Sequence, residues 1–332
     1  MKLSVLITTY NLEKYIDETL KSVVEQETDF EYEILVGDDG SADKTADRVR
    51  EWMDKYPSLI KLYVMDRDPD KKYHRIERAS KNRINLIKHA KGEYLIFLDG
   101  DDWYTDKEKL KKQVDILDRS PGAVLCAHNI NIYHSEESCE KMLNFKKEFT
   151  VEPEFYWESC MYFHSDTVMF RNVFASSKES MAVLKNPVFS KYYDDNIIVY
   201  LLLKYGKMIY IPDVMANYRQ LENSSWNSVS EVEKSLINIV DYDLERRINL
   251  SFRGASKLRH VKDIFSALKN YKSITPEVKE KYLAIAERDE LKTVKRILKS
   301  HAVVRFFGIL GCMPYMEKEF MRVIKKKILY TK

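Results

Sequence analysis

Three carboxylates fall within four residues in the segment Leu98-Asp99-Gly100-Asp101-Asp102-Trp103. Like charges at this spacing repel one another, so the segment is either a solvated acidic turn or a place where a cation offsets the charge. Mg²⁺ and Mn²⁺ bind oxygen ligands, typically a few carboxylates together with substrate phosphates. Alone, such a triplet favours a surface loop. Here it follows an apolar run, and Gly100 allows close backbone approach, which shifts the interpretation towards a cation site.

Two further segments carry side chains that could bind a nucleoside. In Val36-Gly37-Asp38-Asp39-Gly40-Ser41, one carboxylate could accept a hydrogen bond from a nucleobase N–H, although this segment also suits a tight turn and a helix cap. In Thr8-Thr9-Tyr10-Asn11, Tyr10 could stack on a base and Thr9 could offer a hydroxyl or backbone donor. Plain packing is the alternative for an aromatic residue in such a turn.

The elements that must position these residues alternate along the first hundred positions. Apolar runs at 3–8, 32–36, 60–65 and 94–98 predict strands, and helices are expected between them, while the charged stretch 66–81 predicts a loop. Asn11 and Ser41 are predicted helix caps. Strands alternating with helices imply a mostly parallel sheet with helices on both faces. Because both acidic segments follow strands, we expect them at one edge of that sheet.

The later chain predicts a second region. Segments 123–126, 167–170 and 208–211 are further expected strands, and a helix over Ile197–Leu202 precedes the last of them. From about Ser230 the sequence reads as helical and amphipathic. We therefore predict one domain over 1–226 and a helical C-terminal region over 227–332.

Composition limits the class of protein. The 332 residues carry a formal net charge of only +3, which gives no argument for a nucleic-acid partner. The four cysteines, at 126, 139, 160 and 312, have no spacing typical of a zinc site or a disulfide framework. The sequence shows no signal peptide and no apolar run of the ~20 residues that span a bilayer. These features predict a cytoplasmic protein.

The segment Lys292–Lys332 is basic and encloses an apolar stretch from Ala302 to Met313. Such a stretch could lie in the interface of an anionic membrane. Alternatively, it could pack onto the main domain or onto a second copy of the chain. A peripheral position on the inner face of the cell membrane and a homodimer are both kept as hypotheses.

The three N-terminal segments, taken together and in this order, are much more specific than any one of them. With Ala90-Lys91-Gly92-Glu93-Tyr94-Leu95-Ile96-Phe97 leading into the acidic cluster, the sequence resembles glycosyltransferase family 2, which has the GT-A fold. Gly206–Pro212 and Asn217-Tyr218-Arg219 also look like the family. The resemblance covers roughly Lys2 to Trp226.

This resemblance implies a GT-A, Rossmann-like α/β fold whose mostly parallel central sheet is flanked by helices. It also implies an inverting transfer from a nucleotide-sugar, usually a UDP-sugar, to a hydroxyl of a saccharide or lipid-linked saccharide in surface polysaccharide or glycan synthesis. The site residues that the resemblance implies are Thr9, Tyr10 and Asp39 at the nucleoside, Asp99 at the ribose or metal, Asp101 at Mn²⁺ or Mg²⁺, and Asn82 and Arg83 lining the donor pocket. A solvated helix charge is the alternative for Arg83.

The resemblance also implies a catalytic carboxylate shortly before Gly206-Lys207. The spacing favours Asp195, with Asp194 as its neighbour, and a neighbouring carboxylate tends to raise the pKa of a base. Capping of the helix near Ile197 is the alternative for the pair. Three positions depart from the family pattern: Thr8 replaces a frequent Pro, Asp194 a frequent Glu, and Leu221 a frequent His. His164 is a weak acceptor-side candidate.

Two other functions remain as alternatives. A nucleotidyltransferase would be expected to carry a Gly-rich phosphate loop and a Lys near the N-terminus, which the segment 4–11 lacks. A non-catalytic nucleotide-sugar-binding module would be supported by loss of the base, but Asp194 and Asp195 are both present.

Overall fold

The computed structural model describes residues 1–68, 70, 71, 73, 75–159, 161–176, 182, 184, 186, 191, 195–221, 229–248 and 253–330. Within these ranges, the side chains of 75, 76, 176, 195, 196, 253–256 and 319–330 lie outside the description. The chain divides into two compact units, one of Met1–Glu152 with Tyr162–Gln220 and one of Pro153–Met161 with Leu221–Lys332. We call them the sheet unit and the helical unit.

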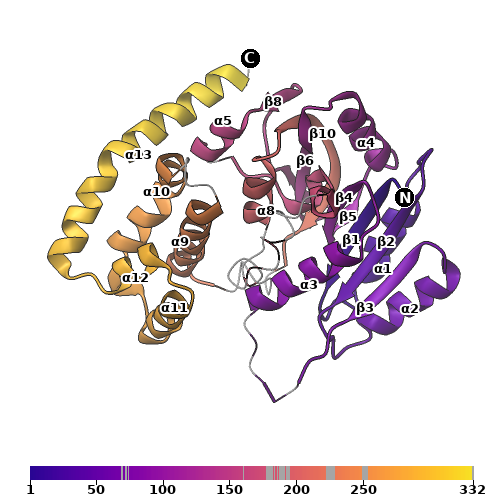
Figure 1. Cartoon of the computed structure of the whole chain (residues 1–332), viewed down its shortest axis with the longest axis horizontal. Coiled ribbons are helices and arrows are strands. Elements are labelled where there is room, and N and C mark those ends of the chain that lie inside the picture. The colour runs from indigo at the N-terminus through magenta and orange to yellow at the C-terminus, as the bar shows by residue number, and fades with distance from the viewer. Residues whose placement is uncertain are drawn as a thin grey trace. The chain divides into compact units, whose positions relative to one another are not determined.

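The sheet unit contains the strands and the first helices (Figure 1). Its strands are β1 Leu3–Thr9, β2 Tyr32–Asp38, β3 Ile60–Val64, β4 Tyr94–Asp99, β5 Trp103–Tyr104, β6 Ala123–Ser135, β7 Ser138–Lys141, β8 Phe149–Val151, β9 Met169–Arg171 and β10 Lys207–Arg219. Its helices are α1 Ile16–Val24, α2 Thr45–Lys55, α3 Arg75–His89, α4 Lys109–Arg119, η1 Ser165–Thr167, α6 Val173–Ser176 and α8 Asp195–Leu202.

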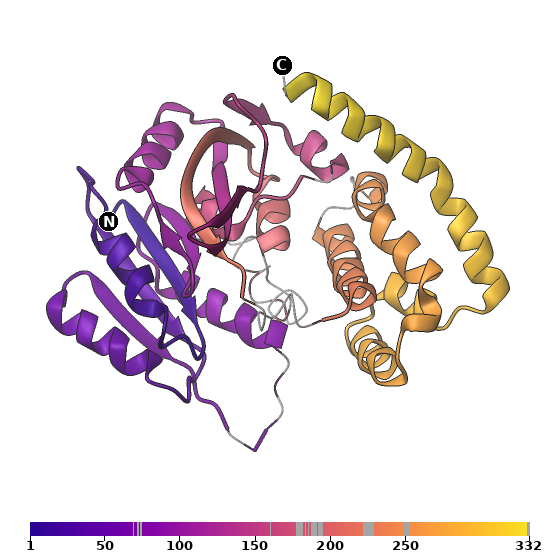
Figure 2. The same ribbon diagram turned by 180° about the vertical axis from the view of Figure 1, so that it is seen from behind.

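One sheet runs in the order β3-β2-β1-β4-β9-β6-β10-β5, with β7 on β6 and β8 on β10. The pairs β3–β2, β2–β1, β1–β4 and β6–β10 are parallel, whereas the short β9 is antiparallel to both β4 and β6. The long strands β6 and β10 lie side by side in both views (Figures 1 and 2). The predicted α/β fold, with its largely parallel sheet, is confirmed.

Continuous burial explains why the central strands form. Val5, Leu6, Ile34, Leu35 and the rest of the apolar runs in β1, β2 and β4 are almost fully buried, as in a parallel sheet covered on both faces. Each acidic segment begins where such an apolar run ends. In the β1–β2 and β1–β4 registers, Thr9 pairs with Asp38 and Thr8 with Asp99. The polar residues therefore meet at one edge of the sheet.

Several local predictions were wrong. Asn11 does not cap α1, because α1 begins at Ile16 after Tyr15; instead Asn11 has φ 55° and its Oδ1 accepts the Ala42 N–H. Ser41 does not cap α2, because its hydroxyl donates to the Asp38 carboxylate. Helix α3 begins at Arg75, so it takes up part of the charged stretch 66–81 that was predicted to be a loop.

The helical unit is formed by α5 Pro153–Glu158, α9 Glu231–Ile248, α10 Arg253–Lys269, η4 Tyr271–Ser273, α11 Pro276–Arg288, α12 Lys292–Leu298 and α13 Ala302–Tyr330. Helix α5 precedes η1 and β9 in the chain, yet it belongs to this unit. The buried Arg259 on α10 holds it by donating to the carbonyls of Ser159 and Met161, at 3.2 and 2.9 Å, and to the Tyr156 hydroxyl at 3.1 Å. The helical unit is therefore assembled from two stretches of chain.

The predicted division into 1–226 and 227–332 stays a prediction, since residues 222–228 lie outside the described ranges. Among the residues that are described, no helix is both long enough and apolar enough to cross a bilayer.

Candidate functional site

Asp99 is the last residue of β4, and its partners fix its orientation. Its Oδ1 accepts a 2.8 Å hydrogen bond from the Thr8 hydroxyl on the neighbouring β1 and lies 3.7 Å from the Arg83 guanidinium on α3. The next residue, Gly100, donates its N–H to the Thr8 carbonyl at 2.8 Å. A Cβ at Gly100 would lie 3.0 Å from that carbonyl oxygen, so a residue without a side chain suits this turn. The carboxylate is left about one-third exposed.

Asp101 follows on the same turn and is held in an environment that opposes its charge. Burial, together with the neighbouring charge of Asp99, raises the pKa of Asp101 to about 7. A cation between the two carboxylates would remove this repulsion. The two predicted metal residues thus lie together at the strand end, as the sequence indicated.

Asp102 is fully buried and faces a second buried carboxylate, Asp166 of η1. Asp102 Oδ2 and Asp166 Oδ2 find no N–H or O–H donor among the described residues. Burial raises the pKa of both groups, and the charge of Asp166 raises that of Asp102 further. For Asp166, the charge of Asp99 acts in the same direction as burial, whereas His164 and the hydrogen bond with Asp102 oppose it. With His164, whose Nδ1 lies 3.5 Å from Asp166 Oδ2, they form a group whose ligand atoms lie within 4.8 Å of one another. This composition, two carboxylates and an imidazole, could hold a divalent ion.

Asp166 also acts on the turn that follows β4. Its Oδ1 lies 3.3 Å from the Asp99 N–H and 3.2 Å from the Ser165 hydroxyl, and both donate to it. Because η1 immediately precedes β9, the insertion of β9 beside β4 brings Asp166 to Asp99. His164 packs its ring against Tyr218 of β10, with ring centroids 4.5 Å apart.

The end of β10 holds the acidic turn from the other side. The Arg219 N–H donates to Asp102 Oδ1 at 2.7 Å, and Arg219 Nε donates to the Asp101 carbonyl at 3.0 Å. The guanidinium also pairs with Glu18 at 2.5 Å and stacks over the Trp103 ring at 4.3 Å. The segment Asn217-Tyr218-Arg219 resembles the family, but the sequence suggested no role for it. Its last residue, Arg219, holds the conformation of the acidic turn.

The nucleoside candidates gather around Asp39. Its carboxylate is 3.0 Å from Arg67 and 2.5 Å from Arg78, and its own N–H donates to the Thr9 carbonyl at 2.9 Å. Arg67 stacks over the Tyr10 ring at 4.0 Å, and Tyr10 remains 41% exposed. An accessible aromatic ring thus borders a buried carboxylate that has a guanidinium on either side.

The two candidates on α3 differ in their surroundings. Asn82 is buried, and its Nδ2 donates to the Gly37 carbonyl at 2.7 Å. A Cβ at Gly37 would fall 2.0 Å from Asn82 Oδ1, so the glycine makes room for this amide. Arg83, by contrast, points towards Asp99 as described above. Asn82 supports the end of β2, whereas Arg83 faces the acidic edge.

The candidate base is only partly described. Asp195 is the first residue of α8, but its side chain lies outside the description, so its role as the base stays a prediction. Asp194 lies outside the described residues altogether.

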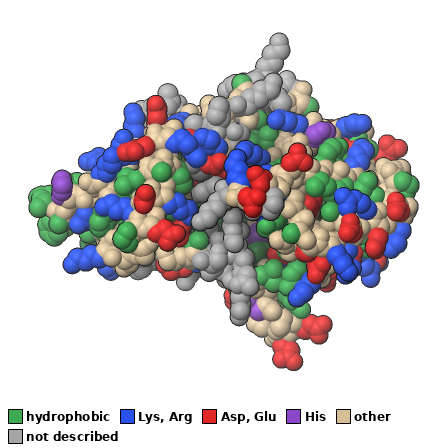
Figure 3. Space-filling view, turned by 90° about the horizontal axis from the view of Figure 1, so that it is seen from below, with side chains coloured by type: hydrophobic (Ala, Val, Ile, Leu, Met, Phe, Trp, Pro, Cys, Tyr) green, Lys and Arg blue, Asp and Glu red, His purple; other side chains and the backbone are tan. Residues whose placement is uncertain are grey.

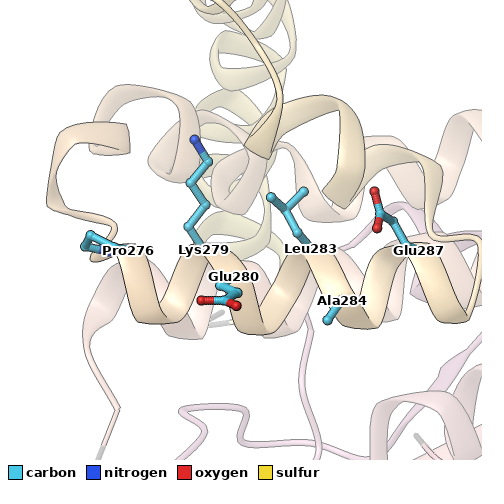
Figure 4. A pocket seen from close by; sticks show the side chains of 6 residues that line it. All are labelled: Pro276, Lys279, Glu280, Leu283, Ala284 and Glu287. Carbon is cyan, nitrogen blue, oxygen red and sulfur yellow. The ribbon is translucent and has the colours of Figure 1, made fainter.

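A depression on the helical unit is lined by one face of α11, including Lys279, Glu280, Leu283 and Glu287 (Figure 4). None of the candidate site residues lies there. The predicted residues Asp39, Asp99 and Asp101 lie at or next to strand ends of the sheet unit and not in this depression.

Comparison with known proteins decides the family. The model of "Glycosyl transferase family 2" matches residues 4–177, which is more than half of the chain and includes the strand ends described above. The chain belongs to glycosyl transferase family 2.

Relatives of several kinds match parts of the chain. Three uncharacterized mycobacterial proteins, from Mycobacterium bovis and two strains of Mycobacterium tuberculosis, are 29% identical over 238 residues, covering 68% of this chain. The match spans 61% of the length of each of those proteins. The poly(ribitol-phosphate) β-N-acetylglucosaminyltransferase TarS of Staphylococcus aureus is 38% identical over 128 residues, covering 38% of this chain and 20% of TarS.

Solved structures confirm the fold. TarS 1–349 of S. aureus, in complex with UDP-GlcNAc, superposes with a TM-score of 0.52 at 19% identity, covering 90% of this chain and 91% of that one. The mannosyltransferase PcManGT from Pyrobaculum calidifontis, in complex with GDP-Man and Mn²⁺, gives 0.50 at 15% identity, covering 93% and 87%. At these identities the likeness establishes the GT-A architecture alone.

Four functional candidates of this family 2 chain were missed from the sequence: Asp102, Asp166, Arg67 and Arg78. Asp102 belongs to the acidic cluster identified in the sequence, but no role of its own, apart from those of Asp99 and Asp101, was predicted for it. Arg67 and Arg78 both lie in the charged stretch 66–81. Only the need of a buried Asp39 for a positively charged partner could have singled them out.

Proposed function

We propose that this protein is an inverting glycosyltransferase that moves a sugar from a uridine or thymidine diphosphate sugar to a hydroxyl acceptor. One observation carries the proposal: in a family 2 chain, the ends of β1, β2 and β4 bring Asp39 to the same edge of the sheet as the carboxylates of Asp99 and Asp101. Groups that can bind a base, on the same edge as ligands for a metal ion that holds a diphosphate, suit a nucleotide-sugar donor.

The pattern of hydrogen-bonding groups around Asp39 supports this choice of base. Arg67 and Arg78 are donors on either side of the Asp39 acceptor, which gives the order donor, acceptor, donor. The edge of uracil or thymine presents O4, N3–H and O2, which is the complementary order. Guanine would place a second N–H opposite an arginine N–H, so that two donors would face each other and neither would have an acceptor. A buried unsatisfied donor costs about 1–3 kcal/mol, equivalent to a preference of roughly tenfold to a hundredfold.

Tyr10 completes this side of the site. Its ring is exposed and Arg67 stacks on it, so a base could lie against the ring with its polar edge towards Asp39. Thr9 holds Asp39 through its carbonyl. Thr9 therefore contributes to the nucleoside pocket by positioning the next strand end.

The residues at the end of β4 suit a divalent ion. Asp99 and Asp101 offer oxygen ligands, and burial together with the charge of Asp99 raises the pKa of Asp101. We assign Mn²⁺ or Mg²⁺ to these two carboxylates, where a bound ion would offset negative charge on the departing diphosphate. Arg83, 3.7 Å from Asp99, supplies a further positive charge at the same edge.

The transfer needs one base. An acceptor hydroxyl oxygen attacks the anomeric carbon as the bond from that carbon to the diphosphate oxygen breaks, and the diphosphate leaves with the bonding electrons. Asp195 takes the hydroxyl proton, with Asp194 beside it in sequence. One displacement inverts the anomeric centre. We assign this role on the family resemblance and on the position of Asp195 at the start of α8.

The acceptor is proposed to be a saccharide or lipid-linked saccharide, in the synthesis of a surface polysaccharide or glycan. TarS, the S. aureus relative, is named for transfer onto poly(ribitol-phosphate), and RfbG of Shigella flexneri, 36% identical over 115 residues (33% of this chain and 36% of RfbG), is named a dTDP-rhamnosyl transferase. The first name gives a polymer as the acceptor and the second gives a dTDP-linked sugar as the donor, and both support the synthesis of a glycan.

The proposal is tested by titrating UDP, dTDP, CDP and GDP into the protein by calorimetry, with and without Mn²⁺. UDP and dTDP should bind at least about tenfold more tightly than GDP. Asp101→Ala should abolish the manganese-dependent part of the affinity. Equal affinity for GDP would reject the assignment of the base, and unchanged manganese dependence in Asp101→Ala would reject the metal site. A screen of the corresponding nucleotide sugars for metal-dependent hydrolysis then identifies the sugar.

A further inference from the structure

Helix α13 exposes six large apolar side chains in its first half. Val303, Val304, Phe306, Phe307, Leu310 and Met313 are 46–66% accessible to solvent. The steps from 303 to 306 and 307, then to 310 and 313, keep them on one side of the helix. Figure 3 shows a group of hydrophobic side chains on the surface of the helical unit. A stripe of this kind on a surface marks a contact with another molecule.

The opposite side of α13 is already used. Cys312 is buried, and a Cβ at Gly308 would lie 3.0 Å from Leu268 of α10, so the two helices approach closely there. Lys257 of α10 also lies over the Tyr315 ring at 4.6 Å. The helix is therefore anchored by one face to its own unit, and the apolar stripe is the face left over.

The charge around the stripe identifies its partner. From Leu291 to Met316 the sequence contains five Lys or Arg residues and no Asp or Glu. Lys292 and Arg296 of α12 are exposed just ahead of the stripe. Lys295 and Lys299 share Glu287 of α11, which lies 3.9 and 2.6 Å away, so part of the charge is balanced within the unit. The chain thus joins exposed aromatic and aliphatic groups to a basic stretch that directly precedes them in sequence, which we call the positive border.

An anionic lipid bilayer complements both properties. Its acyl boundary accepts apolar side chains and its phosphates attract Lys and Arg. A second copy of the chain would place the same positive border against itself in a two-fold contact, which like charges oppose. A helix lying in the interface would bury its apolar face while the basic residues stay at the headgroups.

We propose that α13 docks this protein on an anionic phospholipid surface, with Phe306, Phe307 and Leu310 inserted at the headgroup boundary and the basic residues of α12 at the phosphates. This inference does not depend on the proposed glycosyl transfer. It gives a specific structural form to the peripheral membrane contact predicted from the basic C-terminal segment.

The test is co-sedimentation of the full chain with vesicles of phosphatidylcholine alone and of phosphatidylcholine mixed with phosphatidylglycerol. Binding to the anionic vesicles should be at least about tenfold stronger and should weaken as salt is added. Phe306→Ser with Phe307→Ser should lower binding about tenfold, as should Lys292→Glu with Arg296→Glu. The matched control, Lys55→Glu with Lys88→Glu on the sheet unit, should bind like the unmodified protein.

Folding of each variant is checked by circular dichroism and thermal unfolding, which these exposed substitutions should leave unchanged. The proposal is overturned if the unmodified protein stays in solution with both vesicle types, or if the folded double serine variant binds as strongly as the original. A dimer that forms in the absence of lipid and is abolished by the serine pair, without vesicle binding, would assign the stripe to a second copy instead.

Discussion

The main-chain N–H of Arg219 donates a 2.7 Å hydrogen bond to the buried carboxylate of Asp102. This single contact ties the last residue of β10 to the turn after β4, although 117 positions separate the two residues in sequence. The Arg219 side chain reinforces it through the Asp101 carbonyl. The geometry of the proposed metal ligands therefore depends on a strand that contributes no ligand itself.

Arg219→Ala should weaken manganese-dependent UDP binding by about tenfold, because the turn carrying Asp101 loses a side-chain donor and a stacked guanidinium. Calorimetry at a temperature where the variant is folded measures this. Arg171→Ala is the matched control, since Arg171 donates to the carbonyls of Ala123 and Leu117 far from this turn. The role assigned to Arg219 is wrong if both variants lose nucleotide affinity equally.

Asp195→Asn should leave UDP affinity nearly unchanged and remove sugar transfer, because an amide cannot take the acceptor proton. The measurements are UDP titration and product formation with the donor found in the nucleotide-sugar screen. Full transfer by this variant would show that another group is the base. Asp194→Asn, assayed in parallel, separates the two neighbours.

Arg67→Met should lower UDP affinity by about tenfold and reduce the preference for UDP over GDP, because one of the two donors beside Asp39 is removed. The unbranched apolar side chain of Met, although shorter than that of Arg, keeps part of the contact with Tyr10. Arg50→Met, at an exposed ion pair with Asp47, serves as the control. An unchanged UDP-to-GDP ratio in Arg67→Met would count against the proposed base pocket.

Gly37→Ala should destabilise the protein by about 1–3 kcal/mol, because the new Cβ would fall 2.0 Å from Asn82 Oδ1. Combining it with Asn82→Ala should recover part of that loss, since the clashing amide is gone. Urea unfolding of the two single variants and the double variant measures the coupling. If the changes in the free energy of unfolding of the two single variants simply add in the double variant, then the Cβ at position 37 does not clash with the Asn82 amide.

The helical unit should lose stability at alkaline pH through His260. Burial by itself lowers the pKa of this imidazole, but the facing carboxylates of Glu245 and Asp263 outweigh burial and the nearby Arg259 and raise it to about 9. A raised pKa means that the folded state holds the proton more tightly than the unfolded state. The stabilisation is therefore complete below the ordinary pKa of 6.5 and is lost as the pH rises through about 9.

Thermal unfolding followed from about pH 6 to pH 10 should show this as a fall of a few degrees in Tm that His260→Gln removes. The exposed His89→Gln is the control and should leave the slope unchanged. A His260→Gln profile parallel to that of the unmodified protein would mean that the histidine does not carry the effect.

The sequence was sufficient to predict which residues lie at the strand ends, but it was insufficient to predict the residues that surround them. Asp39, Asp99 and Asp101 could be placed together because each follows an apolar run, and parallel strands end at a common edge. Asp166 could not be placed, since its position depends on the antiparallel insertion of β9 between β4 and β6. That pairing is long-range and leaves no local pattern.

The two predicted caps were wrong for a related reason. Asn11 and Ser41 have side chains typical of helix starts, but each bonds across the strand ends instead. The Asn11 Oδ1 accepts the Ala42 N–H, and the Ser41 hydroxyl accepts the Asn11 N–H at 2.8 Å. Tertiary contacts outweighed the local preference for capping. Arg67 and Arg78 lie in the charged stretch 66–81, whose composition does not separate them from its other charged residues; only the burial of Asp39, which the sequence does not give, could have singled them out.

The route of the chain through α5 restricts how this protein can be dissected. A truncated chain ending at Gln220 would keep Tyr156 and Trp157, both almost fully buried in the intact chain, while removing Arg259, which donates to the carbonyls of Ser159 and Met161. Such a fragment would expose two large aromatic rings on the nine-residue segment Pro153–Met161, which would have lost its packing partners in the helical unit. Replacing that segment with a short polar linker would be the rational first step towards expressing the sheet unit by itself.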